Sequence, residues 1–225
     1  MNICNWQRYQ QNSVLNLDED NLFKIAVDEH FDRIVNDYNQ VLSEKELDKA
    51  KKYNKESDGR RYIVSKYYLR KILSSFIKTD APAINFKETS NKKPSLAGIE
   101  FNVTHSGNFV LIVVSKSQVG IDLELINKSF DFKPLLANCF HPDEVVYLKS
   151  SNKETADFYR LWTRKEALLK ATGEGLIDEL DQLNCLDNHL TRNNLVYYLS
   201  SFLIENDYVM SLAKLENGHS NFWEY

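Results

Sequence analysis

The pattern of hydrophobic and polar positions indicates short strands in several separate parts of the chain. Strands are expected at 22–27, within 81–115, and at 119–124, 194–204 and 208–215. The segment 119–124 alternates apolar and polar residues, as a half-buried strand does, and it follows the apolar run 109–115. Residues 205–208 join the last two runs and suit the turn of a β-hairpin.

Amphipathic helices are predicted where apolar residues recur at helical spacing. The segments are 43–53, 60–77, 141–150 and 153–176. Ser43, with Glu46 three residues later, forms a capping-box pattern at the start of the first segment. Pro142 lies early in the third segment, where proline is tolerated in a first helical turn. Gly173 and Gly175 are expected to end the fourth segment.

The order of these elements favours an α+β fold. Strands and helices come in groups, without the βαβ alternation of a doubly wound sheet. Each half of the chain carries one long helix and a few antiparallel strands, although no exact sequence repeat is visible. We therefore expect two similar α+β halves, residues 1–116 and 117–225, with no low-complexity linker between them.

Composition places the chain among ordinary globular proteins. Its 225 residues, of which 43% are hydrophobic and 27% charged, suffice for one large domain or two small ones. No stretch approaches the ~20 apolar residues that a membrane span needs, and residues 1–13 lack the apolar core of a secretory signal. The three cysteines are far apart and form no CxxC pair, so a reducing cytoplasm is the expected location.

Charge is unevenly distributed along the chain. The net charge of −4 argues against general nucleic-acid binding, but the stretch from Lys45 to Lys71 contains ten basic and four acidic residues. A solvated helix face explains most of these lysines, and a local site for a small polyanion is the alternative. The same stretch could also steer an acidic protein partner.

Three carboxylates are candidates for metal binding. Asp122 and Glu124 are two residues apart on a predicted strand, so both point to the same face. Together with Glu166 they would form an oxygen-only ligand set of the kind that suits Mg²⁺. A solvent-facing pair without a role remains the alternative for the strand. A helix-surface ion pair with Lys170 remains the alternative for Glu166, because the two are four residues apart.

Two further residues have competing interpretations. Lys165 has the pattern of an ordinary lysine on an exposed helix face. His105 lies in the sequence "HSGN", which predicts a tight turn and which could also present backbone N–H groups to a phosphate.

Taken together, three motifs resemble those of the 4′-phosphopantetheinyl transferases of the larger, single-chain type. They are "FNVTHSG", "VGIDLE" and "FYRLWTRKEALLKATGEGL", in this order and at these separations. The resemblance implies transfer of the phosphopantetheine arm of coenzyme A to a serine of an acyl or peptidyl carrier protein, with release of adenosine 3′,5′-bisphosphate. It also implies a monomer of two α+β halves related by a pseudo-twofold axis, with coenzyme A in the cleft between them.

The resemblance assigns roles to individual residues. The implied metal ligands, in the C-terminal half, are Asp122, Glu124 and Glu166. The implied coenzyme A contacts are Arg60, Arg61, Lys93, Thr104, His105, Lys165 and Lys170. Lys92 stands where the family has the glycine of a G-K-P turn, and Glu174 is acidic where some relatives carry a lysine.

These assignments lead to a mechanistic hypothesis. Mg²⁺ would neutralise the diphosphate of coenzyme A, and the carrier serine would attack the β-phosphorus in line. The catalytic residues would be Asp122 as a metal ligand, Glu166 as the base and Lys170 as the group that stabilises the leaving phosphate. A Mg²⁺-dependent nuclease or other phosphotransferase, and a non-catalytic carrier-binding module, are the competing interpretations.

Overall fold

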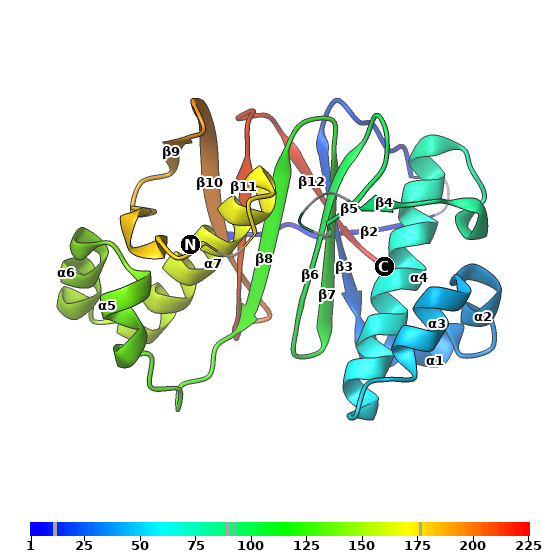
Figure 1. Ribbon diagram of the computed structural model, residues 1–225, viewed down its shortest axis with the longest axis horizontal. Coiled ribbons are helices and arrows are strands. Elements are labelled where there is room, and N and C mark those ends of the chain that lie inside the picture. The colour runs from blue at the N-terminus through cyan, green and yellow to red at the C-terminus, as the bar shows by residue number, and fades with distance from the viewer. Residues whose placement is uncertain (11–12, 89–90, 92, 176) are drawn as a thin grey trace.

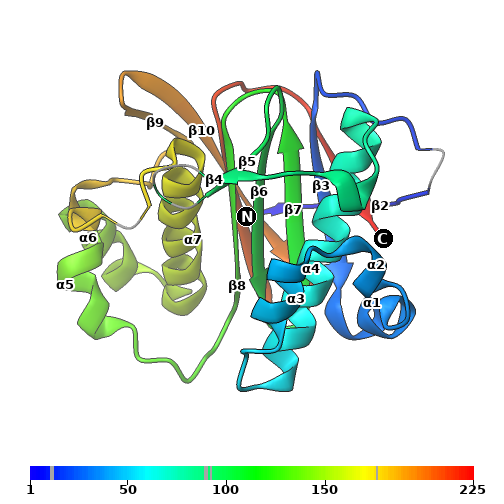
Figure 2. The same ribbon diagram turned by 45° about the vertical axis from the view of Figure 1, so that its right-hand side comes forward.

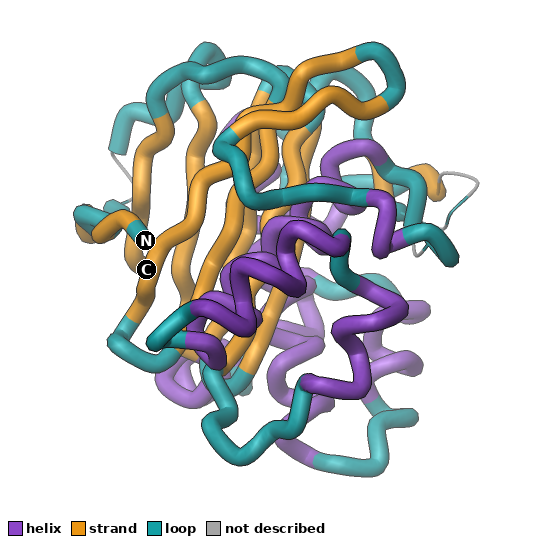
Figure 3. Tube along the Cα trace, turned by 90° about the vertical axis from the view of Figure 1, so that its left-hand side faces the viewer, coloured by secondary structure: helices purple, strands orange, loops and turns teal. Residues whose placement is uncertain are grey.

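The computed structural model describes the whole chain except residues 11–12, 89–90, 92 and 176, and it shows a mixed α+β fold. Two five-stranded sheets meet near the middle of the molecule, and a long helix lies against each of them (Figure 1). Seen from the side, the strands stand largely on one side and the helices on the other (Figure 3). No helix in the described ranges is both long and apolar enough to cross a membrane.

The first of the two sheets is built mainly from the second part of the chain and is called the C-terminal sheet. Its strands are β1 (Asn2–Ile3), β8 (Val119–Leu125), β9 (His189–Arg192), β10 (Leu195–Ile204) and β11 (Tyr208–Lys214). The order is β1-β10-β11-β8, with β9 also paired to β10. All of these pairs are antiparallel except that of β1 with β10. The hairpin expected around residues 205–208 is confirmed, since Glu205 and Asn206 both have positive φ between β10 and β11.

The second sheet is built mainly from the first part of the chain and is called the N-terminal sheet. Its strands are β2 (Gln7–Arg8), β3 (Asp20–Ala26), β6 (Glu100–Ser106), β7 (Phe109–Ser115) and β12 (Ser220–Glu224). The order is β2-β12-β3-β7-β6. A separate two-stranded ribbon consists of β4 (Lys87–Glu88) and β5 (Pro94–Ser95).

Seven α-helices are present in the described ranges. They are α1 (Val27–Ile34), α2 (Tyr38–Val41), α3 (Glu44–Ala50), α4 (Glu56–Ile77), α5 (Leu136–Cys139), α6 (Pro142–Ser150) and α7 (Glu154–Thr172). The four predicted helices are confirmed as α3, α4, α6 and α7, and α4 begins four residues earlier than the expected start at 60. Gly173 ends α7 with a φ of 73°, in the left-handed region that favours glycine.

The capping box predicted at the start of α3 is confirmed. The Ser43 amide donates to the Glu46 carboxylate at 2.9 Å, and the Glu46 amide donates to the Ser43 hydroxyl at 3.4 Å. Arg70 of α4 donates to the same Glu46 carboxylate at 2.8 Å. The side chain that caps α3 therefore also fixes this helix on α4.

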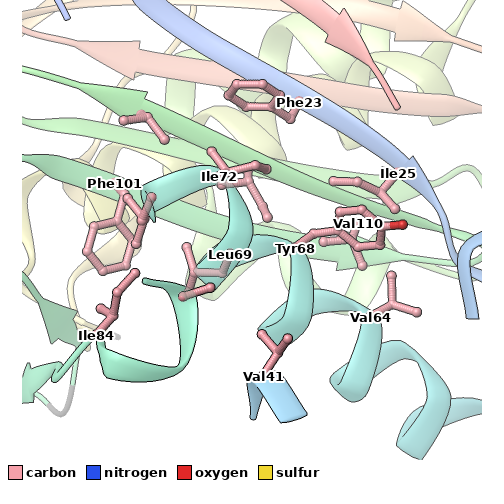
Figure 4. Close-up of a cluster of buried hydrophobic side chains, with 14 of the residues drawn as sticks. Phe23, Ile25, Val41, Val64, Tyr68, Leu69, Ile72, Ile84, Phe101 and Val110 are labelled. Carbon is pink, nitrogen blue, oxygen red and sulfur yellow. The ribbon is translucent and has the colours of Figure 1, made fainter. Parts of the chain in front are cut away.

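The long helix α4 covers one face of the second sheet. Alternate residues of β3 and β7 point at the helix, and a buried cluster forms between them (Figure 4). The labelled members include Phe23, Ile25, Val64, Tyr68, Leu69, Ile72, Phe101 and Val110. A second cluster, around Phe158 and Leu161, lies between α7 and the other sheet.

A third cluster joins the two sheets. Leu22 and Leu111 of the second sheet pack with Ile121 and Met210 of the first. Leu22 precedes Phe23 on β3, so the third cluster lies on the sheet face opposite to α4. The two sheets are therefore joined through the faces that the long helices leave uncovered.

The two ends of the chain cross between the sheets. The N-terminal strand β1 pairs with β10 of the C-terminal sheet, whereas the C-terminal strand β12 lies between β2 and β3 of the N-terminal sheet. The expected division after residue 116 falls in the connection between β7 and β8. The division into two similar halves and the pseudo-twofold axis stay predictions.

A buried lysine links the two sheets near this crossing. Lys214 of β11 donates to Asp20 of β3 at 2.8 Å, and it also donates to the Gly218 carbonyl at 2.7 Å and the Ser220 hydroxyl at 2.8 Å. The side chains of Lys214 and Asp20 are 7% and 12% exposed. Removal of one partner would leave a buried carboxylate without its counterion.

We expect Lys214→Met to lower the free energy of unfolding by about 3–5 kcal/mol, because Asp20 keeps its charge in a poorly solvated place. Urea denaturation measures this effect. The matched control is Lys116→Met, which removes an exposed lysine 3.5 Å from Asp18 and should cost less than about 1 kcal/mol. Equal losses in the two variants would contradict the role of the buried pair.

Candidate active site

A close backbone contact between β8 and α7 positions the candidate site. A Cβ atom on Gly120 would lie 2.0 Å from the Ala167 carbonyl oxygen and 2.4 Å from the Ala171 amide nitrogen. Both neighbours are backbone atoms of the helix, so no side chain could move aside to make room. Because only glycine fits here, α7 lies directly on the strand and faces Asp122, two residues further along β8.

The two sheets adjoin at β8 and β6, and polar side chains connect these strands. The described strands β6 and β8 form no backbone ladder. Instead, the Asn102 amide oxygen accepts from the Ile121 N–H at 3.3 Å, and the Ser106 hydroxyl accepts from the Leu125 N–H at 3.0 Å. Asp122 therefore lies at the seam between the sheets, beneath α7.

Asp122 is the most buried of the three predicted carboxylates, at 5% exposed. Its Oδ1 accepts from the Thr104 hydroxyl at 3.1 Å and from the Lys170 ammonium at 2.6 Å. Its Oδ2 is buried and has no hydrogen-bond partner among the described residues. Burial raises the pKa of Asp122, and Lys170 and Thr104 act in the opposite direction.

Glu124 and Glu166 complete the acidic cluster. Glu124 accepts a hydrogen bond from the Ser106 hydroxyl at 3.0 Å. Burial and the charge of Asp122 raise the pKa of Glu124, and Glu166 adds to this effect. Burial and Asp122 also raise the pKa of Glu166, while Lys170 lowers it. The three carboxylates thus act on one another electrostatically, as expected of groups that share one site.

The carboxylates are the type of ligand that a magnesium site uses, but the ammonium of Lys170 already contacts one of them. The donors are all oxygen atoms, and one buried carboxylate oxygen of Asp122 has no hydrogen-bond partner within the described part of the chain. Even so, no group of three His, Cys, Asp or Glu side chains in the described part of the chain is arranged to hold a metal ion. The ammonium of Lys170 is the cation that contacts Asp122 in this structure.

A basic cavity of about 320 Å³ adjoins the acidic cluster. Its basic lining residues are Lys49, Lys66, Lys93, His105 and Lys170, from α3, α4, β6, α7 and the segment before β5. In Figure 2, β4 and β5 cross between α7 and α4, the two long helices that contribute to this cavity. Basic side chains from both parts of the chain therefore converge beside the carboxylates.

His105 lies in this cavity at the end of β6, where Thr104 precedes it and a turn follows. Enclosure by neighbouring atoms lowers the pKa of its imidazole, and the charges of Arg61 and Lys170 lower it further. The predicted turn at residues 105–108 is confirmed, with Gly107 at a φ of 52°. The position is compatible with both the turn and a phosphate-binding role.

The two adjacent arginines point to different surroundings. Neither arginine lines the basic cavity: Arg60 pairs with Glu56 at 2.5 Å with its side chain 38% exposed, and Arg61 pairs with Asp58 at 3.4 Å with its side chain 23% exposed. Arg61 lies close enough to His105 to lower its pKa, and the Nε atom of Arg61 is buried without a hydrogen-bond partner among the described residues. Arg61 is therefore the better placed of the two for an anion beside His105.

The expectation that Lys165 is exposed is wrong. Its side chain is fully buried and its ammonium pairs with Glu144 at 2.8 Å. The same ammonium donates to the carbonyls of Leu180, at 2.9 Å, and Leu183. Lys165 thus serves to join α7 to α6 and to the 180–183 turn, and these contacts use all three of its donors.

Lys93 links the segment before β5 to α7. Its ammonium donates to the Lys170 carbonyl at 3.0 Å, and burial lowers its pKa. The neighbouring Lys92, predicted to alter the turn, lies outside the described residues. Glu174 pairs with Arg192 at 2.8 Å.

Sequence reasoning did not assign Lys49 and Lys66 to the coenzyme A site, although both line the basic cavity. Both belong to the basic stretch from Lys45 to Lys71, so the excess of positive charge was the available signal. Burial lowers the pKa of Lys66, which distinguishes it from a solvated lysine. A larger cavity, of about 1270 Å³, lies elsewhere against α6, α7 and β10, and none of the predicted site residues lines it.

We expect Gly120→Ala to destabilise the protein by about 3 kcal/mol or more, because the added methyl group meets helix backbone that cannot yield. Thermal denaturation measures this effect. Gly218→Ala is the control, since a Cβ at Gly218 has no neighbour within 4 Å. Retained stability in Gly120→Ala would refute the packing argument.

We expect Glu166→Gln to stabilise the metal-free protein at pH 7.5 by about 1 kcal/mol, or 2–4 °C in Tm. Because the pKa of Glu166 is raised on folding, its favourable contribution is complete below the unfolded pKa and is lost as pH rises through the folded pKa. The gain should therefore vanish below about pH 4.5. Differential scanning calorimetry across this range, with a chelator, measures it.

Glu174→Gln provides a control of opposite sign. The hydrogen bond to Arg192 lowers the pKa of Glu174, so its contribution is present above the unfolded pKa and is lost as pH falls. This variant should lower the Tm at pH 7.5. A change in Tm of the same sign in both variants would contradict the view that the charge of Glu166 destabilises the acidic cluster.

Comparison with known proteins identifies related sequences over most of the chain. The family model of the 4′-phosphopantetheinyl transferase superfamily matches residues 118–213, and that of the N-terminal part of 4′-phosphopantetheinyl transferases matches residues 31–117.

Individual relatives agree with the family models. The chain is 34% identical over 154 residues to a putative 4′-phosphopantetheinyl transferase of Synechocystis sp., an alignment that covers 65% of this chain and 63% of that protein. It is 33% identical over 180 residues to the 4′-phosphopantetheinyl transferase HetI of Nostoc sp., with 76% of each chain covered. It is 26% identical over 148 residues to Sfp of Bacillus subtilis, with 64% and 65% covered.

Among solved structures, the holo-[acyl-carrier-protein] synthase of Thermotoga maritima aligns with a TM-score of 0.32 and 17% identity. This alignment covers 45% of the present chain and 64% of that one.

Proposed function

Since the chain belongs to the 4′-phosphopantetheinyl transferase family, we propose that it transfers the phosphopantetheine arm of coenzyme A to a serine of an apo carrier protein. Adenosine 3′,5′-bisphosphate would be the other product. The observation that supports this proposal most directly is that an acidic cluster and a basic cavity lie next to each other. A cluster of three carboxylates, with an unpartnered Asp122 oxygen, adjoins a cavity lined by basic side chains.

The basic cavity would bind the nucleotide end of coenzyme A. Lys49, Lys66 and His105 face one cavity, so several phosphate oxygens can be contacted together. Arg61 is near enough to His105 for its charge to lower the histidine pKa, and the Nε atom of Arg61 is buried without a hydrogen-bond partner among the described residues. We assign the predicted arginine role to Arg61 rather than Arg60, because Arg61 is the more buried of the two and its charge lowers the pKa of His105.

The acidic cluster would hold a magnesium ion. The ligands would be Asp122, Glu124 and Glu166, whose oxygen donors suit this ion. When bound, the ion would neutralise the diphosphate charge of coenzyme A. Thr104 donates to Asp122 at 3.1 Å and Ser106 donates to Glu124 at 3.0 Å, so each strand carboxylate is oriented by a hydroxyl group of β6.

Proton transfer is assigned to Glu166. Burial and the charge of Asp122 raise its pKa, which makes the carboxylate a better proton acceptor near neutral pH. The carrier serine oxygen would form a bond to the β-phosphorus while the bond from that phosphorus to the bridging oxygen breaks. The serine proton would go to Glu166, and the departing phosphate of adenosine 3′,5′-bisphosphate would be stabilised by Lys170.

The test is transfer to carrier proteins, followed by intact mass. Incubation with coenzyme A, Mg²⁺ and a panel of apo carrier proteins should add one phosphopantetheine group to at least one of them. We expect Asp122→Asn to slow the transfer by about a hundredfold or more, because loss even of a residue that supports a metal ligand costs 10–100-fold. Glu174→Gln is the matched control and should retain the rate, since Glu174 pairs with Arg192 outside the cluster.

Two outcomes would favour the competing functions. Binding of coenzyme A without labelling of any carrier protein would favour a non-catalytic carrier-binding module. Thermal stabilisation by DNA and Mg²⁺, but not by coenzyme A and Mg²⁺, would favour a nuclease. The monomeric state and the cytoplasmic location stay predictions.

A further inference from the structure

Lys170 is placed where a metal ion would compete with it. Its ammonium lies 2.6 Å from Asp122 Oδ1 and 3.3 Å from the Thr104 hydroxyl. The side chain of Asp122 is only 7% exposed, so few positions around this carboxylate are open to a cation. Glu166, one helical turn before Lys170, is near enough to Asp122 for that charge to raise the pKa of Glu166. A lysine thus contacts the most buried of the proposed metal ligands.

Two cations beside one buried carboxylate repel each other. A divalent ion that binds Asp122 Oδ2 would lie within a few ångströms of the ammonium on Oδ1 of the same group. In a poorly solvated site this repulsion is screened less than in water. Lys170 therefore has to leave, or the divalent ion binds weakly.

The side chain of Lys170 has space into which it can move away from Asp122. Its side chain is 29% exposed, and it borders both the basic cavity and a second cavity of about 260 Å³ that Glu166 also lines. The flexible lysine side chain can therefore leave Asp122 without movement of α7, whose backbone is held on Gly120. An anion in the basic cavity would offer the ammonium a new partner.

We propose that Lys170 is the counterion of Asp122 in the resting protein and makes the binding of the divalent ion depend on the arrival of a diphosphate. This inference rests on the proposed function. Without a diphosphate, the ammonium stays on Asp122 and opposes the metal ion. When the diphosphate of coenzyme A enters the basic cavity, Lys170 moves to it and Asp122 becomes free to bind the metal. Lys170 is thus a positioning residue in addition to its role toward the leaving phosphate.

The decisive measurement is calorimetric titration with Mg²⁺ and with Mn²⁺ in the absence of coenzyme A. We expect Lys170→Met to bind the metal about tenfold more tightly than the wild type, because the competing charge is gone. Lys170→Arg keeps the charge and should bind as weakly as the wild type. Lys116→Met removes the same charge from an exposed pair with Asp18 and should leave the affinity unchanged.

Several outcomes would overturn the proposal. Unchanged or weaker metal binding by Lys170→Met would do so, as would equal tightening in Lys116→Met. If Lys170→Met does not fold, Lys170→Gln tests the same loss of charge. A wild-type protein that binds Mg²⁺ only with coenzyme A, combined with a Lys170→Met that gains nothing, refutes this inference and leaves the proposed function intact. A wild-type protein that binds neither ligand refutes both.

A spectroscopic measurement on the wild type follows the lysine itself. NMR of lysine labelled with ¹³C at Cε shows one resonance per lysine, and the resonance missing from Lys170→Arg assigns Lys170. We expect this resonance to shift little with Mg²⁺ alone and strongly when Mg²⁺ and coenzyme A are both present. A Lys170 resonance that ignores coenzyme A would show that the ammonium does not change partners, and would overturn the proposal.

Discussion

The backbone contact between α7 and Gly120 determines the geometry of the candidate site. It fixes how deep the helix lies on the sheet, and the residues on either side of Ala167 and Ala171 thereby come to face β8. A hydroxyl pair reinforces the same arrangement, since Thr163 of α7 and Ser211 of β11 are 2.8 Å apart. Because Ser211 pairs with Asp122 in the ladder between β11 and β8, the strand carboxylate and the helix are held against a common neighbour.

The carboxylates at the near side of α7, which faces β8, repel one another. Polar contacts on the far side of the helix offset this repulsion. Burial raises the pKa of all three carboxylates on the near side, and the charge of Asp122 further raises those of Glu124 and Glu166, a costly arrangement in the absence of a metal ion. On the far side, Arg164 donates to three backbone carbonyls, the Ser201 hydroxyl and the Asn188 side chain. The adjacent Lys165 is buried against Glu144. Polar contacts of this number keep the helix in place whether or not the acidic cluster is neutralised.

The sequence allowed the α+β class, the two long helices and the carboxylate-bearing strand to be predicted, because each has a strong local period. It could not distinguish Arg60 from Arg61, since neighbouring positions on a helix differ by 100° and the periodicity of α4 does not establish which of them faces His105. Lys165 was misjudged because its partner Glu144 lies on another helix, and long-range pairing of this kind leaves no local signal. The parallel strand β12 was missed for the same reason, as its partners are about 200 residues away.

The crossing of the chain ends has a consequence for biosynthesis. Strand β3 acquires its second neighbour only when residues 220–224 are available, so the N-terminal sheet cannot be completed while those residues are still inside the ribosome. Until β12 is in place, the chain presents an open sheet edge at β3, and such edges invite pairing with other chains. Completion of the N-terminal sheet therefore depends on a strand that is synthesised about 200 residues after β3, and insertion of that strand covers the exposed edge.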